Sequence, residues 1–172
     1  MKNFVLVVLV MLAFMSCQQT QKIGYVDNAT LVNDYQEKKD IEAQLQSKID
    51  AFQKRTDSLR QAFQLEINEA EIKARRMSQK NVQKLSKDLQ DKETALSQRV
   101  QFEQQQIAQE SQSKNDSLIK KVKDFVKDYG KKNGYNFILG SNEAGSVMYG
   151  QDTSDLTQTI LDLLNAQYKE EK

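Results

Sequence analysis

One long stretch of this chain, from Gly24 to Gly130, is interrupted by no glycine, and the whole chain contains no proline. Glycine and proline are the residues that most often break a helix. The stretch is rich in Gln, Lys, Glu, Asp, Ala, Leu and Arg, with single apolar residues three or four positions apart. We therefore predict a helical arm over residues 29–132, about 150 Å long as one rod or about 75 Å long as a hairpin.

The apolar residues of the arm follow the heptad spacing of a coiled coil. Thr56 and Glu66 interrupt this seam, and its phase shifts near Val100 and Ile107, which indicates a stutter. Seven-residue spacing relates two sets of positions in the first half of the arm: Leu45, Phe52 and Leu59, and Ile49, Phe63, Ala70 and Met77.

The distribution of apolar residues favours a folded arm. They are densest at both ends of the arm and sparsest over 73–87. A chain that folds back near 77–81 brings the two apolar ends together, so we predict an antiparallel helical hairpin, with a break at 78–81. No glycine marks the turn, which leaves a single continuous rod as the alternative.

Short strand patterns lie on both sides of the arm. Residues 22–27 alternate and include β-branched and aromatic side chains, which is typical of a strand. Asp27 or Asn28 is suited to cap the helix that follows. Residues 135–139 and 147–149, separated by a glycine-containing loop, predict a β-hairpin.

A final helix follows the second strand pattern. Polar residues at 152–155 are suited to its N-terminus, where the helix dipole favours negative charge. Its predicted buried stripe is Leu156, Ile160, Leu163 and Leu164. The fold class is therefore α+β: a long coiled-coil hairpin that projects from a small body formed by 22–28 and 133–168, with a C-terminal helix.

This body has roughly fifty residues, a size at which a single core is marginal without disulfides, a metal or association. We therefore predict an obligate oligomer that associates through this body. The residues expected in this contact are Ile23, Tyr25, Val26, Phe137, Leu139, Val147 and Tyr149.

The first sixteen residues have the pattern of a secretory signal peptide. An apolar run from Phe4 to Phe14, too short to span a membrane, is followed by Met15, Ser16 and the one cysteine of the chain, Cys17. This arrangement is similar to the lipobox of bacterial lipoproteins, so we predict a lipid on Cys17 and a spacer over 17–21. Ordinary cleavage near Ser16 is the alternative.

Charge is balanced over most of the chain but not at the predicted tip of the arm. The chain has 25 basic and 24 acidic residues, and the loss of Lys2 with residues 1–16 would make it formally neutral. Residues 73–87 contain no acidic side chain. The segment's basic side chains, which we predict to contact an anionic membrane surface or a client, are Lys73, Arg75, Arg76, Lys80, Lys84 and Lys87.

The side chains that most enzymes need are missing or scattered. The chain has no histidine, which is the commonest metal ligand and general base, and no cysteine other than Cys17. The carboxylates of the arm alternate with Lys and Arg, as on a solvated helix face. We predict no enzymatic activity, no metal and no cofactor. The predicted export also argues against a nucleic-acid partner.

The order of these parts and the residues at the two ends point to one family. The motifs are Lys-Ile-Gly-Tyr-Val-Asp at 22–27, Gly-Tyr-Asn-Phe-Ile-Leu at 134–139, Val-Met-Tyr at 147–149 and Asp-Thr-Ser-Asp-Leu-Thr at 152–157. With these motifs and a long helical hairpin between them, the chain resembles the Skp/OmpH family of periplasmic chaperones.

The resemblance implies a trimer with three arms around a central cavity, in which unfolded outer-membrane proteins are held without ATP. The sequence is then that of a periplasmic holdase, tethered to a membrane if Cys17 is lipidated. The alternative is a structural lipoprotein whose coiled coil spaces or links layers of the envelope. A structural rod is expected to show a continuous register and no substantial β body, and strands flank the arm here.

Overall fold

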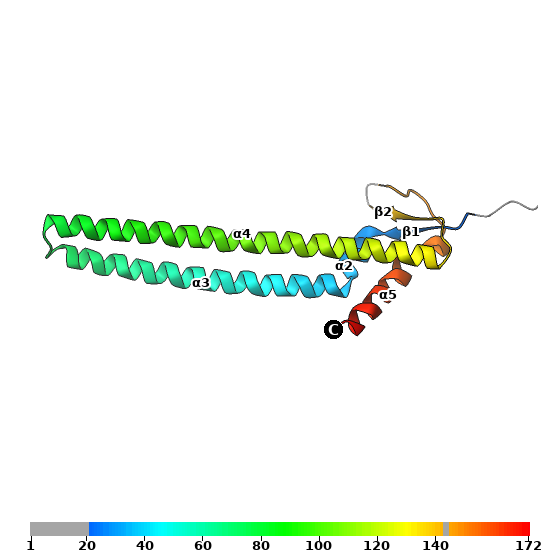
Figure 1. Ribbon diagram of the computed structural model, residues 1–172, viewed down its shortest axis with the longest axis horizontal. Helices are drawn as coiled ribbons and strands as arrows, with labels where there is room; N and C mark the ends of the chain where they lie inside the picture. The colour runs from blue at the N-terminus through cyan, green and yellow to red at the C-terminus, as the bar shows by residue number, and fades with distance from the viewer. Residues whose placement is uncertain (1–20, 143–144) are drawn as a thin grey trace, which may run out of the picture.

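The computed structural model describes residues 21–142 and 145–172. The predicted signal peptide, the lipid site Cys17 and spacer residues 18–20 lie outside the described residues. The described chain has a long two-helix arm and a small body at one end of it (Figure 1).

The arm is formed by helices α3 (Gln36–Ala74) and α4 (Gln79–Lys132), which run antiparallel. This confirms the predicted helical hairpin and excludes the single rod. Besides the absence of glycine and proline up to Gly130, side chains one turn apart support the helices. For example, Gln46 donates to Asp50 at 2.9 Å, and Lys120 Nζ to Asp124 at 2.6 Å.

The turn of the hairpin lies between Ala74 and Gln79. The backbone N–H groups of Arg76 and Met77 bond to the carbonyls of Lys73 and Ala74, both at 3.1 Å. Ser78 is extended, with a ψ of 153°, and its carbonyl accepts the N–H of Val82. The predicted break at 78–81 is therefore wrong for residues 79–81, because α4 has already begun there.

The chain does not enter the arm as one helix. Asp27 caps the short helix α2 (Asn28–Asp34), accepting the N–H groups of Ala29 and Thr30 at 2.8 and 3.0 Å. Tyr35 is extended, with a ψ of 126°, and separates α2 from α3. The prediction of an unbroken helix through this region is wrong, because the buried Tyr35 side chain fixes a bend at the base of the arm.

Two strands form the sheet of the body. β1 (Ile23–Asp27) pairs with β2 (Phe137–Ser141) in parallel, with Ile23 opposite Phe137 and Asp27 opposite Ser141. Parallel strands need a long crossover connection, and here the whole arm is that connection.

The predicted β-hairpin is wrong, since Val147 and Met148 lie in a bend and 147–149 pairs with no strand of the described chain. β2 pairs with β1, from the start of the chain, instead of with 147–149. The short run 147–149 lies between two glycines and contributes no ladder of its own.

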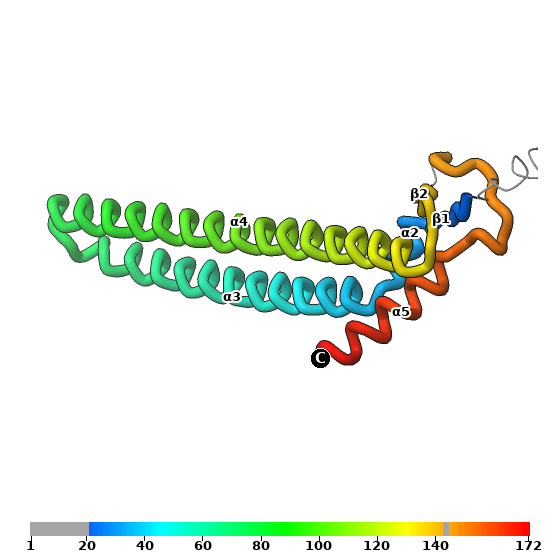
Figure 2. Tube along the Cα trace, turned by 45° about the vertical axis from the view of Figure 1, so that its right-hand side comes forward, coloured from blue at the N-terminus to red at the C-terminus, as the bar shows by residue number. Residues whose placement is uncertain are grey.

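The core lies where the sheet, the base of the arm and helix α5 (Thr157–Glu170) meet; a 3-10 turn, η1 (Asp152–Ser154), precedes α5. Figure 2 shows α5 beside the base of the arm. Leu163 is 43% exposed, so its predicted burial is wrong, and Leu161 takes its place in the helical stripe. The largest fully buried side chains are Leu31, Tyr35, Leu118, Ile160 and Leu164.

Candidate functional surfaces

The six basic residues predicted at the tip are brought together by the turn. Lys73 lies in the last turn of α3, Arg75 and Arg76 lie in the turn of the hairpin, and Lys80, Lys84 and Lys87 lie in the first turns of α4. All six are exposed, and Lys73 pairs with Glu69 at 3.5 Å. The tip therefore presents a basic surface at the end of the arm opposite the body (Figure 1).

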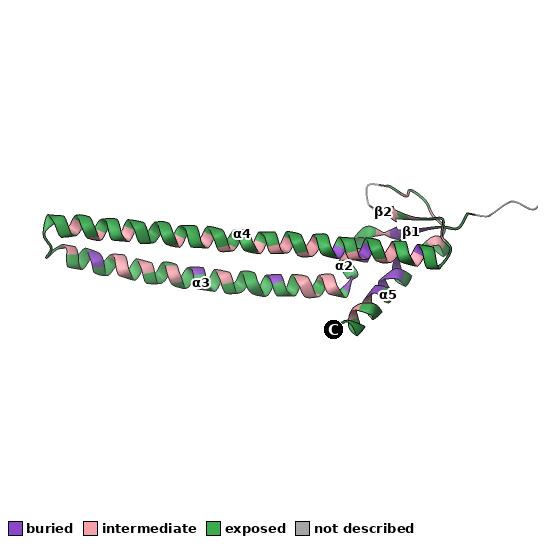
Figure 3. Cartoon of the chain, in the orientation of Figure 1, coloured by how far each residue is buried: buried purple, intermediate pink, exposed green. Residues whose placement is uncertain are grey.

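The flanks of the arm expose apolar side chains among the charged ones. Leu65 and Ile72 on α3 are 64% and 66% exposed, and Phe102 on α4 is 60% exposed. Met77, predicted at the seam, is 40% exposed at the turn. Figure 3 shows that the buried residues of α4 lie near the body, whereas α3 has only a few buried residues, spaced along its length. These side chains are available for contact with another polypeptide.

One edge of the hairpin carries polar contacts between the two helices. From one contact to the next, the residue number on α3 rises by as much as the residue number on α4 falls, as an antiparallel register requires. The contacts are Glu37–Lys121 at 2.8 Å, Gln44–Lys114 at 3.2 Å, Lys48–Glu110, Arg55–Glu103 at 2.7 Å and Glu66–Lys92.

The other edge of the hairpin contains two adjoining cavities of about 320 and 330 Å³, both lined by Thr56, Arg60 and Val100. Among the described residues, no cross-helix ion pair spans this edge. The floor is apolar and includes Phe52 and Leu96. The ion-paired edge also has a cavity, of about 260 Å³, lined by Lys48, Arg55 and Glu103. In the part of the chain that the structure describes, the two edges therefore differ in their cross-helix ion pairs rather than in their openness.

The body residues predicted for association fall into two groups. Ile23, Phe137 and Leu139 are 46%, 55% and 46% exposed on one face of the sheet, and Tyr149 is 85% exposed. Tyr25 and Val147 are half-buried. Val26 is buried in the chain's own core, where it packs with Leu31 and Ile160. The body therefore has an exposed apolar surface, and Val26 belongs to the core beneath it rather than to that surface.

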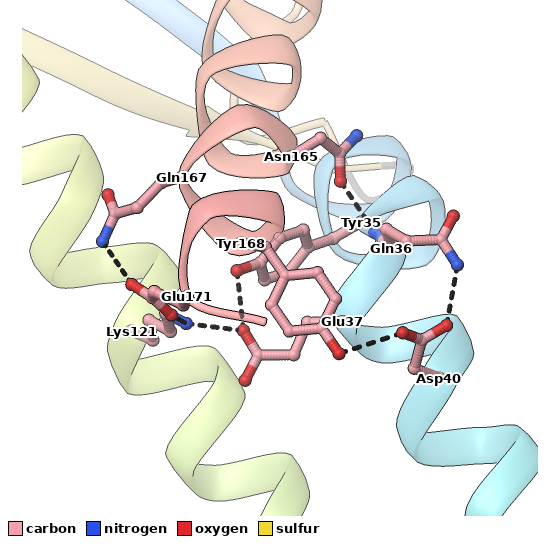
Figure 4. Close-up of polar contacts among 9 residues, drawn as sticks. All are labelled: Tyr35, Gln36, Glu37, Asp40, Lys121, Asn165, Gln167, Tyr168 and Glu171. Carbon is pink, nitrogen blue, oxygen red and sulfur yellow. Dashed lines mark hydrogen bonds and ion pairs between the residues drawn. The ribbon is translucent and has the colours of Figure 1, made fainter.

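A network of polar side chains joins α5 to the base of the arm (Figure 4). Tyr168 Oη donates to Asp40 at 2.9 Å, and Lys172 Nζ donates to the same carboxylate at 2.6 Å. The backbone N–H of Gln36 donates to Asn165 Oδ1 at 2.8 Å, which caps the first turn of α3. Hydrogen bonds from Lys172, Gln36 and Tyr168 lower the pKa of Asp40 to about 2.

The second half of this network is centred on Glu37. Tyr35 Oη donates to it at 2.7 Å, and Lys121 Nζ donates to it at 2.8 Å and to Glu171 at 2.7 Å. Burial and the bond to Glu37 raise the pKa of Tyr35. Burial opposes the charged form of Lys121, but its two carboxylate partners outweigh burial and raise its pKa. This arrangement is suited to hold helices together.

Sequence reasoning missed both this network and the ion-paired edge. The ion-paired edge could have been found in the sequence. Complementary side chains have the same spacing on the two halves of the arm, and this spacing fixes the register of α3 against α4. The network could not, since it depends on where α5 comes to lie.

Neither a metal centre nor a membrane span is present in the described ranges. No group of three or more His, Cys, Asp or Glu side chains is placed to hold a metal ion. Within 21–142 and 145–172, no helix combines the length and the apolar character needed to cross a bilayer.

Comparisons with known proteins place the architecture in a family. A family model described as "Outer membrane protein (OmpH-like)" matches residues 22–164. A crystal structure from Caulobacter crescentus CB15, described as a candidate OmpH-like outer membrane chaperone, superposes with a TM-score of 0.75. That chain is 16% identical to this one, and the match covers 88% of each chain. No curated protein matches this chain.

Proposed function

Because the chain belongs to the OmpH-like family of outer membrane proteins, we propose that it is a periplasmic chaperone that binds unfolded outer-membrane proteins without ATP. In this proposal, several copies associate through their bodies, and their arms surround the client. The family resemblance implies three copies. Unfolded β-barrel proteins expose unpaired strands and apolar faces, which aggregate in water.

The observation that carries the proposal is the surface of the arm. Its two helices extend far beyond the core and expose Leu65, Ile72 and Phe102 singly, separated by charged side chains. Such a surface offers many weak apolar contacts and no single deep site. Weak, distributed contacts are suited to a client that must be held and later released.

The decisive experiment uses the chain from residue 18 onward. A urea-denatured outer-membrane β-barrel is diluted into buffer without nucleotide, and light scattering is recorded at rising ratios of this protein to the client. We expect scattering to be suppressed and the suppression to saturate at a fixed ratio. If a folded, oligomeric sample suppresses nothing at several-fold excess, the chaperone proposal fails. The structural lipoprotein then becomes the better hypothesis.

We assign a second contact to the tip of the arm. Its six exposed basic side chains complement an anionic membrane surface or acidic segments of a client. Replacing Lys80, Lys84 and Lys87 by Gln should weaken co-sedimentation with anionic vesicles and leave neutral vesicles unbound. The same number of substitutions at Lys38, Lys120 and Lys169, near the body, is the matched control.

A further inference from the structure

The charge of the arm changes sign just behind its tip. On α3, residues 61–72 have three acidic side chains and no basic one, and on α4, residues 88–98 have three acidic side chains and one basic one, Lys92. We call the carboxylates of these two segments the acidic belt: Glu66, Glu69, Glu71, Asp88, Asp91 and Glu93. The basic tip, formed by the six basic residues of 73–87, adjoins the belt on both helices.

The hairpin places the two halves of the acidic belt side by side. Glu66 of α3 is paired with Lys92 of α4, so the two acidic segments lie at the same height on the arm. At 1.5 Å per residue, the belt lies about 12 to 20 Å behind Gln79, the first residue of α4. The arm therefore ends in a basic surface with an acidic surface directly behind it.

Most of these charges face solvent. Glu66 is half-buried, and the other five carboxylates of the belt are exposed. Lys73 pairs with Glu69 at 3.5 Å and so connects the two regions. The side chains that take part in no ion pair of the described chain are Arg75, Arg76, Lys80, Lys84 and Lys87 of the tip, and Glu71, Asp88, Asp91 and Glu93 of the belt.

The rest of the arm has no net attraction for an anionic surface. Outside the tip, the two helices over 36–72 and 88–132 contain 15 basic and 16 acidic side chains. An arm that lies flat on an anionic membrane therefore gains nothing from its length. If the arm tilts away from an end-on contact, the belt is the first part behind the tip to approach the membrane, and it is repelled.

Distance decides between an end-on and a flat contact. The attraction of a basic segment to an anionic membrane decays over a screening length of about 8 Å at physiological ionic strength. In an end-on contact, Arg75, Arg76 and Lys80 lie ahead of every carboxylate of the belt, because they belong to the turn and the first turn of α4. The belt then stays more than one screening length from the membrane. In a flat contact, the carboxylates of the belt touch the membrane together with the basic side chains.

We propose that the arm contacts an anionic membrane surface end-on, through the basic tip alone, with its helices upright on the bilayer. This inference rests on the contact proposed for the tip, assigns it to a membrane and adds the orientation of the arm. Met77 favours a membrane over an acidic client segment. Its apolar side chain is 40% exposed at the turn, among basic residues, and apolar side chains beside basic ones are typical of contacts with the headgroup region.

The orientation has a consequence for the client. An upright arm holds the body about 80 Å from the membrane, which is the length of α4. The exposed Leu65 and Ile72, at the height of the belt, stay off the membrane and remain available to a client. In the proposed assembly, the space between the arms then opens toward the bilayer, so a released client meets the membrane first.

The test is neutron reflectometry of the chain from residue 18 onward on a supported bilayer of phosphatidylcholine and phosphatidylglycerol. The wild-type protein should form a layer at least about 80 Å thick. The belt variant carries Glu69→Gln, Glu71→Gln, Asp88→Asn and Asp91→Asn. It should form a thinner layer and bind vesicles of the same lipids at least about fivefold more tightly in co-sedimentation, because a tilted arm is no longer repelled.

A matched control changes the net charge by the same amount at exposed carboxylates nearer the body. It carries Glu42→Gln, Asp50→Asn, Asp116→Asn and Asp128→Asn, two on each helix of the arm. Because the belt is intact in this variant, the layer thickness and the affinity should remain those of the wild type.

The outcomes separate this inference from the proposed function. A wild-type layer much thinner than the arm is long, or an equal response of the belt variant and the control, overturns the upright orientation while the membrane contact stands. A wild-type chain that does not bind the anionic bilayer overturns both, and acidic client segments become the partner of the tip. Circular dichroism identifies a variant that has lost its helices, and Glu71→Gln with Asp91→Asn alone then provides the same test.

Discussion

The base of the arm and its distal half are built from similar helices but are held together differently. At the base, Leu118 and Val122 of α4 are buried against Leu31 and α5. In the distal half, few seam positions are fully buried, and ion pairs along one edge connect the helices. Packing therefore anchors the arm to the body, while helix propensity and charge maintain the rest. The distal surface is thus free to serve binding.

The sharpest test of this difference compares two isoleucines. Ile160 is fully buried, and Ile72 is 66% exposed. Ile160→Ala should lower the free energy of unfolding by about 2–5 kcal/mol because it leaves a cavity. Ile72→Ala should change it by less than about 0.5 kcal/mol. Urea denaturation followed by circular dichroism at one fixed protein concentration measures both, and equal losses would refute the comparison.

A substitution at Thr56, in the seam of the distal arm, should increase stability rather than lower it. Its side chain is buried at a position where a coiled coil prefers an apolar residue. Thr56→Val replaces the hydroxyl by a methyl group of similar size and should raise the free energy of unfolding by about 1 kcal/mol. Ser58→Val, at an exposed position two residues away, is the control. A loss of stability in Thr56→Val would mean that the hydroxyl is needed there.

Protonation of Asp40 at low pH should destabilise the contact between α5 and the base of the arm. Its pKa in the folded chain is lowered from 3.8 to about 2, so the carboxylate favours folding above pH 4, and this contribution is lost as the pH falls toward 2. Asp40→Asn should therefore flatten the fall of the melting temperature over this range. Tyr168→Phe removes one hydrogen bond to Asp40 and should reduce the slope less. An unchanged slope in Asp40→Asn would contradict this role.

The smallest expected effect is that of a single ion pair on the edge of the arm. Arg55 and Glu103 lie 2.7 Å apart, but the arginine side chain is 47% exposed, so water and salt screen the pair. A double-mutant cycle with Arg55→Gln and Glu103→Gln should give a coupling of about 0.2–1 kcal/mol. The coupling should vanish in high salt. A coupling of several kcal/mol would show that charge, rather than helix propensity, maintains the distal arm.

Regular elements could be predicted from the sequence, but their local ends and partners could not. The absence of glycine and proline predicted the helical arm, the distribution of apolar residues predicted the hairpin, and Asp27 was one of two residues predicted as a cap. The bend at Tyr35 was missed because its cause is burial in a core formed by distant segments. The strand at 147–149 was predicted from side-chain types alone, yet β2 takes its partner from the start of the chain.

The candidate surfaces also differ in whether they could be predicted from the sequence. The basic tip was visible in the sequence, since an unbalanced run of charge needs no tertiary information. The groove between α4 and β2 was not, because Lys123, Lys127 and Lys131, which line it, have the pattern of a solvated helix face until β2 is placed beside them. Asp152 was recognised only as part of a helix start, and its position beside β1 depends on the bridge between Tyr25 and Asp155.

The parallel pairing of β1 and β2 has a consequence for the order of folding. The backbone of Lys22 bonds to the side chain of Asn136, which is 114 residues away along the chain. Closing a disordered loop of that length would cost about 4 kcal/mol of chain entropy. A formed arm removes most of this cost, because Glu37 and Lys121 meet at its base and hold the two ends side by side.

The helices of the arm rely on local contacts, which form fast, whereas the strand pairing is among the most non-local contacts in the molecule. The two helices of the arm should therefore form and pack together first, and β1 and β2 should pair last. Until then, the body through which we propose that copies associate is incomplete. We therefore expect only chains whose arms are already formed to take part in the proposed association.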